Sequence, residues 1–388
     1  MSKSKRLIMI ISVLAVSFIS DMGMYVNPII DTVANAFPGT PYSTILQISA
    51  LPYTTCMIVS FVFGFITGRK IGYKPVIIVG CLCMIAGGVA PAFINGSFTA
   101  ILIARAVFGI GIGLVVCLNA YVLTVFDAST ASLVLGLHIA VINIGSVLMQ
   151  LAAGFLGAIN WHLTFYISLV AAIPLIMTLV FLEEPKREEN TSSERAKIHL
   201  KGWNIVYCLG AILITMFTYP ILAVMSNYIA DLRLGDAAVS GVVLSFYTAG
   251  AALGGLAYST IKKKAGRYSL SIFVGLAALG LVTVIFLRST VMITVGTFLC
   301  GFGFYPTLSL FCDFCGAIND EATMNLAASL IWAGSYFGCG PIAPYWITLC
   351  GKLTGSMTTG SFAIGAALLA VIALIFIFVN PESKSKEA

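Results

Sequence analysis

The chain has 388 residues, of which 59% are hydrophobic and only 9% are charged, and its mean hydropathy is +1.02. Soluble domains contain about 25% charged residues, so this composition excludes a soluble protein and indicates an integral membrane protein. The net charge of +6 comes from basic residues in short loops between apolar segments. We interpret these residues as a topology signal and not as a surface for nucleic acid.

The ten cysteines lie mostly inside apolar segments and lack partners at metal-ligand spacing. We interpret them as packing residues, not as disulfides or metal ligands. The sequence shows no phosphate-binding loop and no nucleophile triad. We therefore expect no metal and no cofactor, and we do not expect an enzyme.

The apolar segments are the main structural signal. The first follows the basic start Met1–Arg6 and continues for more than 20 residues without a small-residue cleavage site, so we predict a membrane helix and not a signal peptide. Twelve such spans are expected, at about residues 7–30, 44–66, 75–94, 98–122, 131–156, 162–182, 203–228, 237–261, 268–287, 290–312, 322–349 and 356–379.

The basic residues set the expected orientation. Of the 21 Lys and Arg residues, all but Arg233, Arg288, Lys352 and the intramembrane Arg105 fall on one side of the twelve spans. That side is expected to be cytoplasmic and to hold both termini. We predict an all-α fold with two pseudo-symmetric six-helix bundles, residues 1–182 and 203–388, joined by a cytoplasmic linker at 183–202.

An internal repeat supports the two bundles. At an offset of 194 residues, Lys70 and Gly72 after the second span match Lys264 and Gly266 after the eighth. The same offset matches Gly109 with Gly303, Gly111 with Tyr305, Asp127 with Glu321 and Arg105 with Leu299. Because each half has an even number of spans, we expect parallel halves related by an axis along the membrane normal.

These features resemble the major facilitator superfamily of secondary transporters. Residues Arg105–Gly111 are similar to its R-x-x-x-G-x-G motif, found mainly in proton-coupled members, and Trp161–Tyr166 is similar to the start of its sixth helix. Within the superfamily, the sequence most resembles the drug:proton antiporter branch, although the antiporter signature of helix 5 is missing. The aspartate that usually precedes the basic pair Arg69–Lys70 is also missing, because Gly68 stands there.

Two charges inside the apolar spans are the principal candidate site. Asp21 lies about 15 Å from the outer end of the first span and Arg105 about 11 Å from the outer end of the fourth, so the two can reach one level. Removal from water favours a neutral carboxyl group and a nearby Arg105 favours the carboxylate, a balance suited to proton coupling. The alternative is a static salt bridge that fixes the two helices.

Other intramembrane polar and aromatic residues are candidates for a substrate cavity. Asn27–Pro28 and Tyr219–Pro220 predict helix breaks at matching places in the two halves, which are typical of a central binding site. The alternative for these breaks is helix shaping, and for the aromatics ordinary packing. The cavity candidates are Tyr25, Asn27, Gln47, Asn119, Asn143, Gln150, Tyr219, Asn227, Tyr247, Tyr305, Trp332 and Tyr336.

Charges at the cytoplasmic ends predict a gate. We expect the basic residues after span 2 to meet Asp127, and those after span 8 to meet Asp313, Asp320 and Glu321. The alternative is that they only set topology. The gate candidates are Arg69, Lys70, Gly72, Lys74, Asp127, Lys264, Gly266, Arg267 and Glu321.

The resemblance and the charge pair together predict a monomeric secondary transporter in the cell membrane, a bacterial inner membrane by composition. We expect alternating access and proton-coupled efflux of a small amphipathic or aromatic solute. Uptake of a small organic anion or metabolite, with Arg105 binding its carboxylate, is the alternative within this class. A receptor without transport activity or a channel is the alternative from another class.

Overall fold

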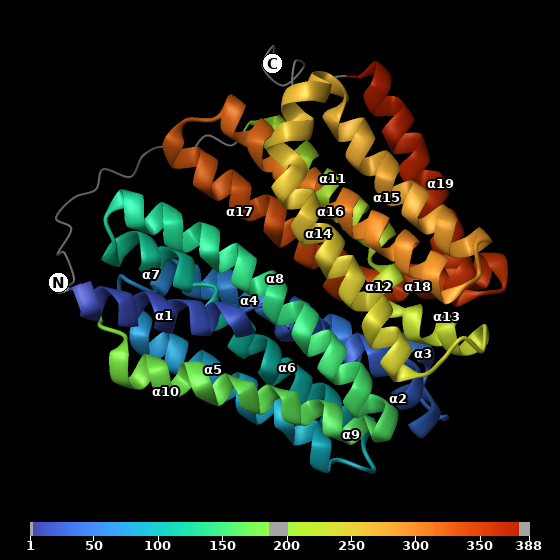
Figure 1. Ribbon diagram of the computed structural model, residues 1–388, viewed down its shortest axis with the longest axis horizontal. Helices are drawn as coiled ribbons and strands as arrows, with labels where there is room; N and C mark the ends of the chain where they lie inside the picture. Colours follow the sequence, from blue (N-terminus) through green and yellow to red (C-terminus); the bar gives the residue numbers. More distant parts are fainter. Residues whose placement is uncertain (1–2, 186–200, 380–388) are drawn as a thin grey trace. The chain divides into compact units, whose positions relative to one another are not determined.

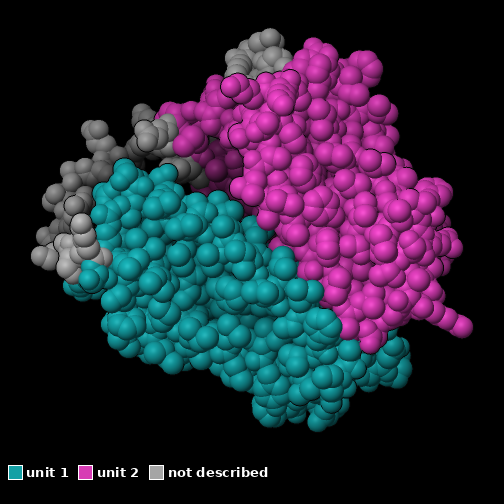
Figure 2. Space-filling view, viewed as in Figure 1, with its two compact units in different colours: residues 1–189 teal, residues 190–388 magenta. Residues whose placement is uncertain are grey.

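The computed structural model describes residues 3–185 and 201–379, and Figure 1 shows that these residues form helices joined by short connections. The described residues contain no strand, only an isolated bridge between Thr67 and Ile71. The chain divides into two compact units, residues 1–189 and 190–388 (Figure 2). The predicted domain limits stay predictions, since residues 186–200 of the predicted linker lie outside the described residues.

The N-terminal unit begins with a helix that is broken after Ile19. Its elements are α1 Lys3–Ile19, η1 Met22–Ile29, α2 Ile30–Ala36, α3 Tyr42–Ile45, α4 Gln47–Ile66, α5 Tyr73–Val89, η2 Ala90–Phe93, α6 Phe98–Val115, α7 Leu118–Val125, α8 Ala128–Ile159, α9 Trp161–Thr164, η3 Phe165–Ala171 and α10 Ala172–Phe181.

The C-terminal unit repeats this order with longer uninterrupted helices. Its elements are α11 Gly202–Thr218, α12 Pro220–Ala223, α13 Met225–Asp231, α14 Ala237–Ala265, η4 Gly266–Tyr268, α15 Ser269–Phe286, α16 Thr290–Ile318, α17 Glu321–Phe337, the π-helical turn η5 Gly338–Ile342, α18 Ala343–Thr354 and α19 Met357–Phe378.

Eleven helical stretches of the described residues are long and apolar enough to cross a membrane. One of them, Ala237–Phe286, is 50 residues long and contains both α14 and α15, which correspond to two predicted spans. The predicted all-helical, twelve-span fold is thereby confirmed. The orientation of the termini stays a prediction.

The two units pack their helices in the same pairs. In the N-terminal unit α6 packs against α4 and α5, and α1 packs against α8. In the C-terminal unit α16 packs against α14 and α15, and α11 packs against α17. These are the same positions in the helix order of each half, so the repeat extends from sequence to packing.

Helix caps correct the register of the repeat. Ser97 caps α6 by accepting from the Ala100 amide, and Ser289 caps α16 in the same way from Met292. The two serines are 192 residues apart, so the equivalent of Arg105 is Thr297 and not the predicted Leu299. Thr297 is fully buried and donates to the carbonyl of Ile293, which leaves the second half without a matching charge.

The same register matches both glycines of the motif in the fourth span. A Cβ at Gly109 would meet the carbonyl of Pro52 on α4, and one at Gly301 would meet the carbonyl of Tyr247 on α14. Gly111 and Gly303 approach α5 and α15 in the same manner. The prediction that Gly111 matches Tyr305 is therefore wrong, because the glycine spacing follows helix contacts that the 194-residue offset misaligns.

Candidate functional site

The break in the first membrane helix is the centre of the candidate site. α1 ends at Ile19, and the chain continues as the 3₁₀ helix η1, which contains Pro28, before α2 resumes. Proline cannot donate a backbone hydrogen bond and disrupts the preceding turn. The sequence predicts a break at Asn27–Pro28, and the structure extends it over the eight residues of η1.

Arg105 lies against this break and is fully buried inside the N-terminal unit. Its Nε donates to the Ile48 carbonyl at 2.8 Å, and its two terminal nitrogens donate to the Tyr25 hydroxyl at 3.3 Å and the Gly23 carbonyl at 3.4 Å. The guanidinium carbon also lies 4.4 Å from the centre of the Phe108 ring. Arg105 therefore ties α6 to η1 and α4.

Tyr25 extends this network toward the sixth span. Its hydroxyl forms a hydrogen bond of 3.0 Å with the Ser168 hydroxyl on η3. Its ring packs edge-on against Phe108 and Phe165. A fully buried tyrosine needs a partner for its hydroxyl, and here Arg105 and Ser168 both supply one. The two irregular segments η1 and η3 and the helix α6 are thus fixed around one aromatic ring.

Asp21 stands at the start of η1 and is half-buried. Its carboxylate accepts a hydrogen bond of 3.4 Å from the Tyr53 hydroxyl on α4. Arg105 donates to Ile48, Tyr25 and Gly23, of which Gly23 lies two positions from Asp21. The two charges therefore lie in one hydrogen-bond network through η1 and α4, and the pairing of Asp21 with Arg105 stays a prediction.

Asn27 links η1 to α4 through a side-chain hydrogen bond. Its side-chain oxygen accepts from the Ser49 hydroxyl, whereas its buried amide nitrogen has no hydrogen-bond partner in the structure. A buried amide donor without a partner costs about 1–3 kcal/mol. Asn27 is therefore a residue whose burial needs an explanation beyond packing.

The other polar candidates of this unit are placed less uniformly. Gln150 is fully buried in α8, and Gln47 is half-buried at the start of α4. Asn143 donates to the carbonyl of Ile139 on its own helix, and Asn119 is exposed on α7. Asn119 and Asn143 are thus not brought to the break in the first helix by any hydrogen bond of the structure.

Aromatic residues dominate the corresponding region of the C-terminal unit. The rings of Tyr247, Phe304, Tyr305 and Trp332 follow one another at centroid distances of 6.2, 5.6 and 5.8 Å. They come from α14, α16 and α17, so the structure brings three of the predicted cavity residues into one row. Phe304 was missed because a phenylalanine in an apolar helix carries no sequence signal of its own.

The predicted break in the seventh span is also present. Tyr219 is buried and precedes α12, whose first residue is Pro220, and Asn227 lies on α13 beyond the break. Tyr336 is half-buried near the end of α17. The break separates α11 from α13 at the position where η1 separates α1 from α2.

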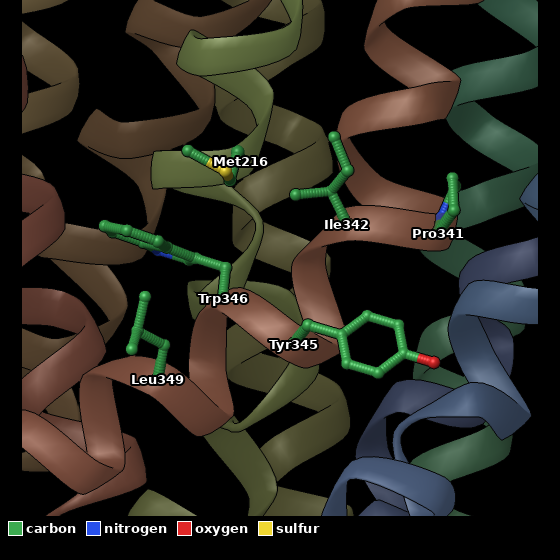
Figure 3. Close-up of a pocket in the computed structure, with 6 residues that line it drawn as sticks. All are labelled: Met216, Pro341, Ile342, Tyr345, Trp346 and Leu349. Atoms are coloured by element: carbon green, nitrogen blue, oxygen red, sulfur yellow. The ribbon is translucent and has the colours of Figure 1, made fainter.

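A pocket of about 310 Å³ lies beside the π-helical turn η5. Figure 3 shows the indole of Trp346 between Met216 and Leu349, while the Tyr345 ring points away from them. The other lining residues are Pro341 and Ile342. The buried indole nitrogen of Trp346 has no hydrogen-bond partner in the structure.

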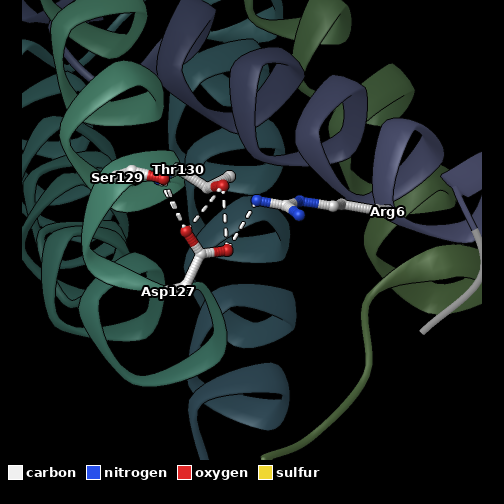
Figure 4. A network of polar contacts seen from close by, with 4 residues as sticks. All are labelled: Arg6, Asp127, Ser129 and Thr130. Carbon is white, nitrogen blue, oxygen red and sulfur yellow. Dashed lines mark hydrogen bonds and ion pairs between the residues drawn. The ribbon is translucent and has the colours of Figure 1, made fainter.

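At the other end of the N-terminal unit, the structure corrects the predicted gate. Asp127 forms an ion pair of 2.6 Å with Arg6 of α1, not with the basic residues after span 2 (Figure 4). It also caps α8 through hydrogen bonds from Ser129 and Thr130. These bonds, from Ser129 first, and Arg6 hold the pKa of Asp127 well below its usual range.

Glu184, and not Asp127, is the carboxylate that contacts the segment after span 2. Its two carboxylate oxygens accept from the backbone amides of Tyr73 and Lys74 at 2.7 Å each, directly after Gly72. A carboxylate at a helix N-terminus satisfies free amides and complements the helix dipole. Lys74 itself donates to the carbonyl of Leu179. The acidic end of the sixth span was the sequence signal for this cap.

Arg69 and Lys70 lie in the turn between α4 and α5, where Gly68 adopts a φ of 80°. Lys5 of α1 completes the charged end of the unit by pairing with Glu183 at 2.5 Å. The ion pairs of Lys5 and Arg6 bind α1 to the segment after α10 and to the start of α8 in the same unit. The described ion pairs at this end therefore hold the bundle together internally.

The C-terminal unit shows the predicted contact with Asp313, through Lys262 at 2.6 Å and the Tyr258 hydroxyl. Asp320 caps α17 by accepting from the Thr323 amide, as Asp127 does from Thr130. Asp320 and not Glu321 is thus the counterpart of Asp127, and the side chain of Glu321 lies outside the described residues.

The turn after α14 carries the other predicted gate residues. Gly266 adopts a φ of 52°, whereas its predicted match Gly72 has a φ of −67°. The two glycines therefore serve different turns. Lys264 is exposed, and Arg267 donates to the carbonyl of Ile377 at 3.4 Å instead of reaching a described carboxylate.

Comparison with known proteins identifies the family. The model of the Major Facilitator Superfamily matches residues 13–341, which is most of the chain. The chain belongs to the Major Facilitator Superfamily. A comparison with curated proteins found no match to this sequence.

Solved structures of the superfamily share the fold at low sequence identity. The nucleoside transporter NupG is 12% identical, with a TM-score of 0.77 over 95% of this chain and 99% of NupG. A D-xylose–proton symporter is 14% identical, with a TM-score of 0.75 over 99% and 100% of the two chains. A bacterial homologue of the human lysosomal transporter Spinster is 15% identical, with a TM-score of 0.75 over 99% and 98%.

In this superfamily member, three residues of the R-x-x-x-G-x-G stretch make packing contacts with neighbouring segments. Arg105 holds η1, Gly109 permits close approach of α4, and Gly111 permits close approach of α5. The fold and family point to a transporter and not to an enzyme. The drug:proton antiporter branch stays a prediction, as does the monomeric state.

Proposed function

We propose that the protein is a proton-coupled secondary transporter that exports a small amphipathic or aromatic solute by alternating access. The observation that carries this proposal is the half-buried carboxylate of Asp21, placed at a broken membrane helix next to the network of Arg105. A broken helix gives local mobility where a change of access needs it. Protonation of Asp21 would change its bond with Tyr53 and so the packing of η1 on α4.

The aromatic character of the solute follows from the C-terminal unit. In the row of Tyr247, Phe304, Tyr305 and Trp332 the first two rings are buried, whereas Tyr305 and Trp332 are partly exposed and offer ring faces without charge. Such a surface suits a flat or amphipathic solute better than a sugar, which requires many hydrogen bonds. Fold neighbours named as nucleoside transporter and D-xylose–proton symporter support solute transport and proton coupling in this fold.

Uptake of a small organic anion is the second candidate, with Arg105 as the binding group. Full burial of Arg105 and its three hydrogen bonds to protein oxygens favour the first candidate. An arginine that binds an anion during each cycle has to release its protein partners first. The cost of that release argues for Arg105 as the support of η1.

The test begins with a thermal-shift screen of the purified protein against metabolites and drugs, and continues with the best hit in proteoliposomes. Proton movement driven by that solute is expected in the wild type and is expected to be lost in Asp21→Asn. Asp31→Asn, in α2 of the same predicted span, is the matched control and should retain it. Wild-type proton coupling in Asp21→Asn at normal membrane levels would contradict the proposal.

The same vesicles separate a transporter from a channel or a receptor. Counterflow of labelled solute against an unlabelled gradient is expected from alternating access. Conductance that does not saturate would indicate a channel instead. Solute binding without any flux would indicate a receptor.

A further inference from the structure

A cluster of cations lies at the end of α14 and in the following turn η4, on the side predicted to be cytoplasmic. Lys263, Lys264 and Arg267 are exposed, and we call these three residues the cationic edge. Lys262 differs from them because it forms an ion pair with Asp313. Among the described side chains of residues 3–185 and 201–379, which do not include that of Glu321, the structure shows no carboxylate paired with any member of the cationic edge.

An apolar surface continues directly from the cationic edge. Arg267 donates to the Ile377 carbonyl near the end of α19, and the Ser271 hydroxyl donates to the Ala373 carbonyl one turn further on. α15 and α19 therefore run side by side here, as Figure 1 also shows. Beside these contacts Ile272 and Phe378 are exposed, Phe378 by 84% of its surface.

Tyr268 joins the charged and the apolar parts. Its ring is 44% exposed, and the guanidinium of Arg267 lies 4.7 Å from its centre. A tyrosine of this kind is typical of the boundary between lipid headgroups and acyl chains. The Arg267 guanidinium thus contacts both the Tyr268 ring and, through the Ile377 carbonyl, the end of α19.

We propose that the cationic edge, with Tyr268 and the adjoining faces of α15 and α19, binds an anionic phospholipid. The phosphate would be held by Lys263, Lys264 and Arg267, and the acyl chains would lie on Ile272 and Phe378. Arginine and lysine next to a membrane helix attract anionic headgroups. An anionic lipid supplies both the negative charge and the apolar chain that this surface combines, which a soluble anion does not.

Topology alone does not account for this arrangement. The positive-inside rule explains why cations lie on one side of the membrane, and it is satisfied wherever on that side they stand. The rule does not explain why three cations that lack a described acidic partner lie next to an exposed apolar surface formed by α15 and α19. The inference is also independent of the transported solute.

The test is a lipid titration of the purified full-length protein followed by native mass spectrometry, with phosphatidylglycerol and with phosphatidylcholine. Tighter binding of phosphatidylglycerol is expected in the wild type. Each Lys or Arg near a membrane surface changes binding by about fivefold, so the triple variant Lys263→Gln, Lys264→Gln, Arg267→Gln should weaken it on the order of 100-fold. High salt should weaken wild-type binding of phosphatidylglycerol and spare that of phosphatidylcholine.

A matched control removes the same net charge elsewhere. The triple variant Arg233→Gln, Arg288→Gln, Lys352→Gln alters the three basic residues predicted on the opposite side and should bind phosphatidylglycerol as the wild type does. Equal loss in both triple variants, or equal binding of the two lipids by the wild type, would overturn the inference. If the first triple variant does not fold, Lys264→Gln alone should still show a loss of about fivefold.

Discussion

Substitutions of Arg105 distinguish a structural network from an exposed binding group. The bond from Nε to Ile48 is short and charge-assisted, and such bonds contribute about 1.5–3 kcal/mol. The stacking on Phe108 adds about 2 kcal/mol for a desolvated pair. Against these gains stands a cost of about 2.5–3.5 kcal/mol for a charge inside the membrane.

The balance predicts that Arg105→Lys is worse than Arg105→Met. Methionine removes the contacts and the cost of the buried charge together, so we expect a loss of about 1–2 kcal/mol in the free energy of unfolding. Lysine keeps the charge but lacks the planar fork that reaches Ile48, Tyr25 and Gly23 at once. We expect Arg105→Lys to lose about 3–5 kcal/mol.

The assay is unfolding in mixed micelles, followed by circular dichroism, at one lipid and detergent composition. The exposed Arg233 supplies the control, and Arg233→Lys and Arg233→Met should both unfold like the wild type. A stable Arg105→Lys together with a strongly destabilised Arg105→Met would refute the reasoning. The same outcome, with anion transport retained in Arg105→Lys, would favour the anion-binding alternative.

Two further predictions concern packing and pH. Gly109→Ala places a methyl group against the Pro52 carbonyl and should destabilise the protein by about 1–3 kcal/mol in the same unfolding assay. Gly136→Ala, which has nothing within 4 Å of the added methyl group, should leave the stability unchanged. Equal effects of the two substitutions would show that the close approach at Gly109 is unimportant. Because the pKa of Asp127 is lowered on folding, its stabilisation is complete above the ordinary value of 3.8 and is lost as the pH falls below it. Melting temperatures of wild type and Asp127→Asn should therefore converge at acidic pH, and a gap that persists there would contradict this linkage.

The charges at the helix ends predicted to be cytoplasmic show how far sequence spacing predicts contacts. Basic and acidic residues at helix ends are visible in the sequence, and the contact of Lys262 with Asp313 follows the predicted pairing. The partner of Asp127 does not, because Arg6 lies in α1 and reaches α8 only through the packing of those helices. Glu184 likewise accepts from the backbone amides of Tyr73 and Lys74, which are more than 100 residues away in the sequence.

The repeat shows the same limit. An offset of 194 residues is half the chain length and aligns the basic turns, but connections of unequal length shift the true register from helix to helix. The caps at Ser97 and Ser289 fix an offset of 192, and those at Asp127 and Asp320 fix 193. Such differences are set by where helices end in space, which a constant offset does not represent.

The sequence by itself determined the membrane class, the number of spans, the family resemblance and the two broken helices. These depend on local properties, namely apolar length, proline and the cost of a charge inside an apolar segment. Only the tertiary structure decided that Arg105 is enclosed by Tyr25, Ile48 and Gly23, because hydrogen-bond partners come from helices that are distant in sequence. The expensive charge was visible in advance, and the oxygens that compensate it were not.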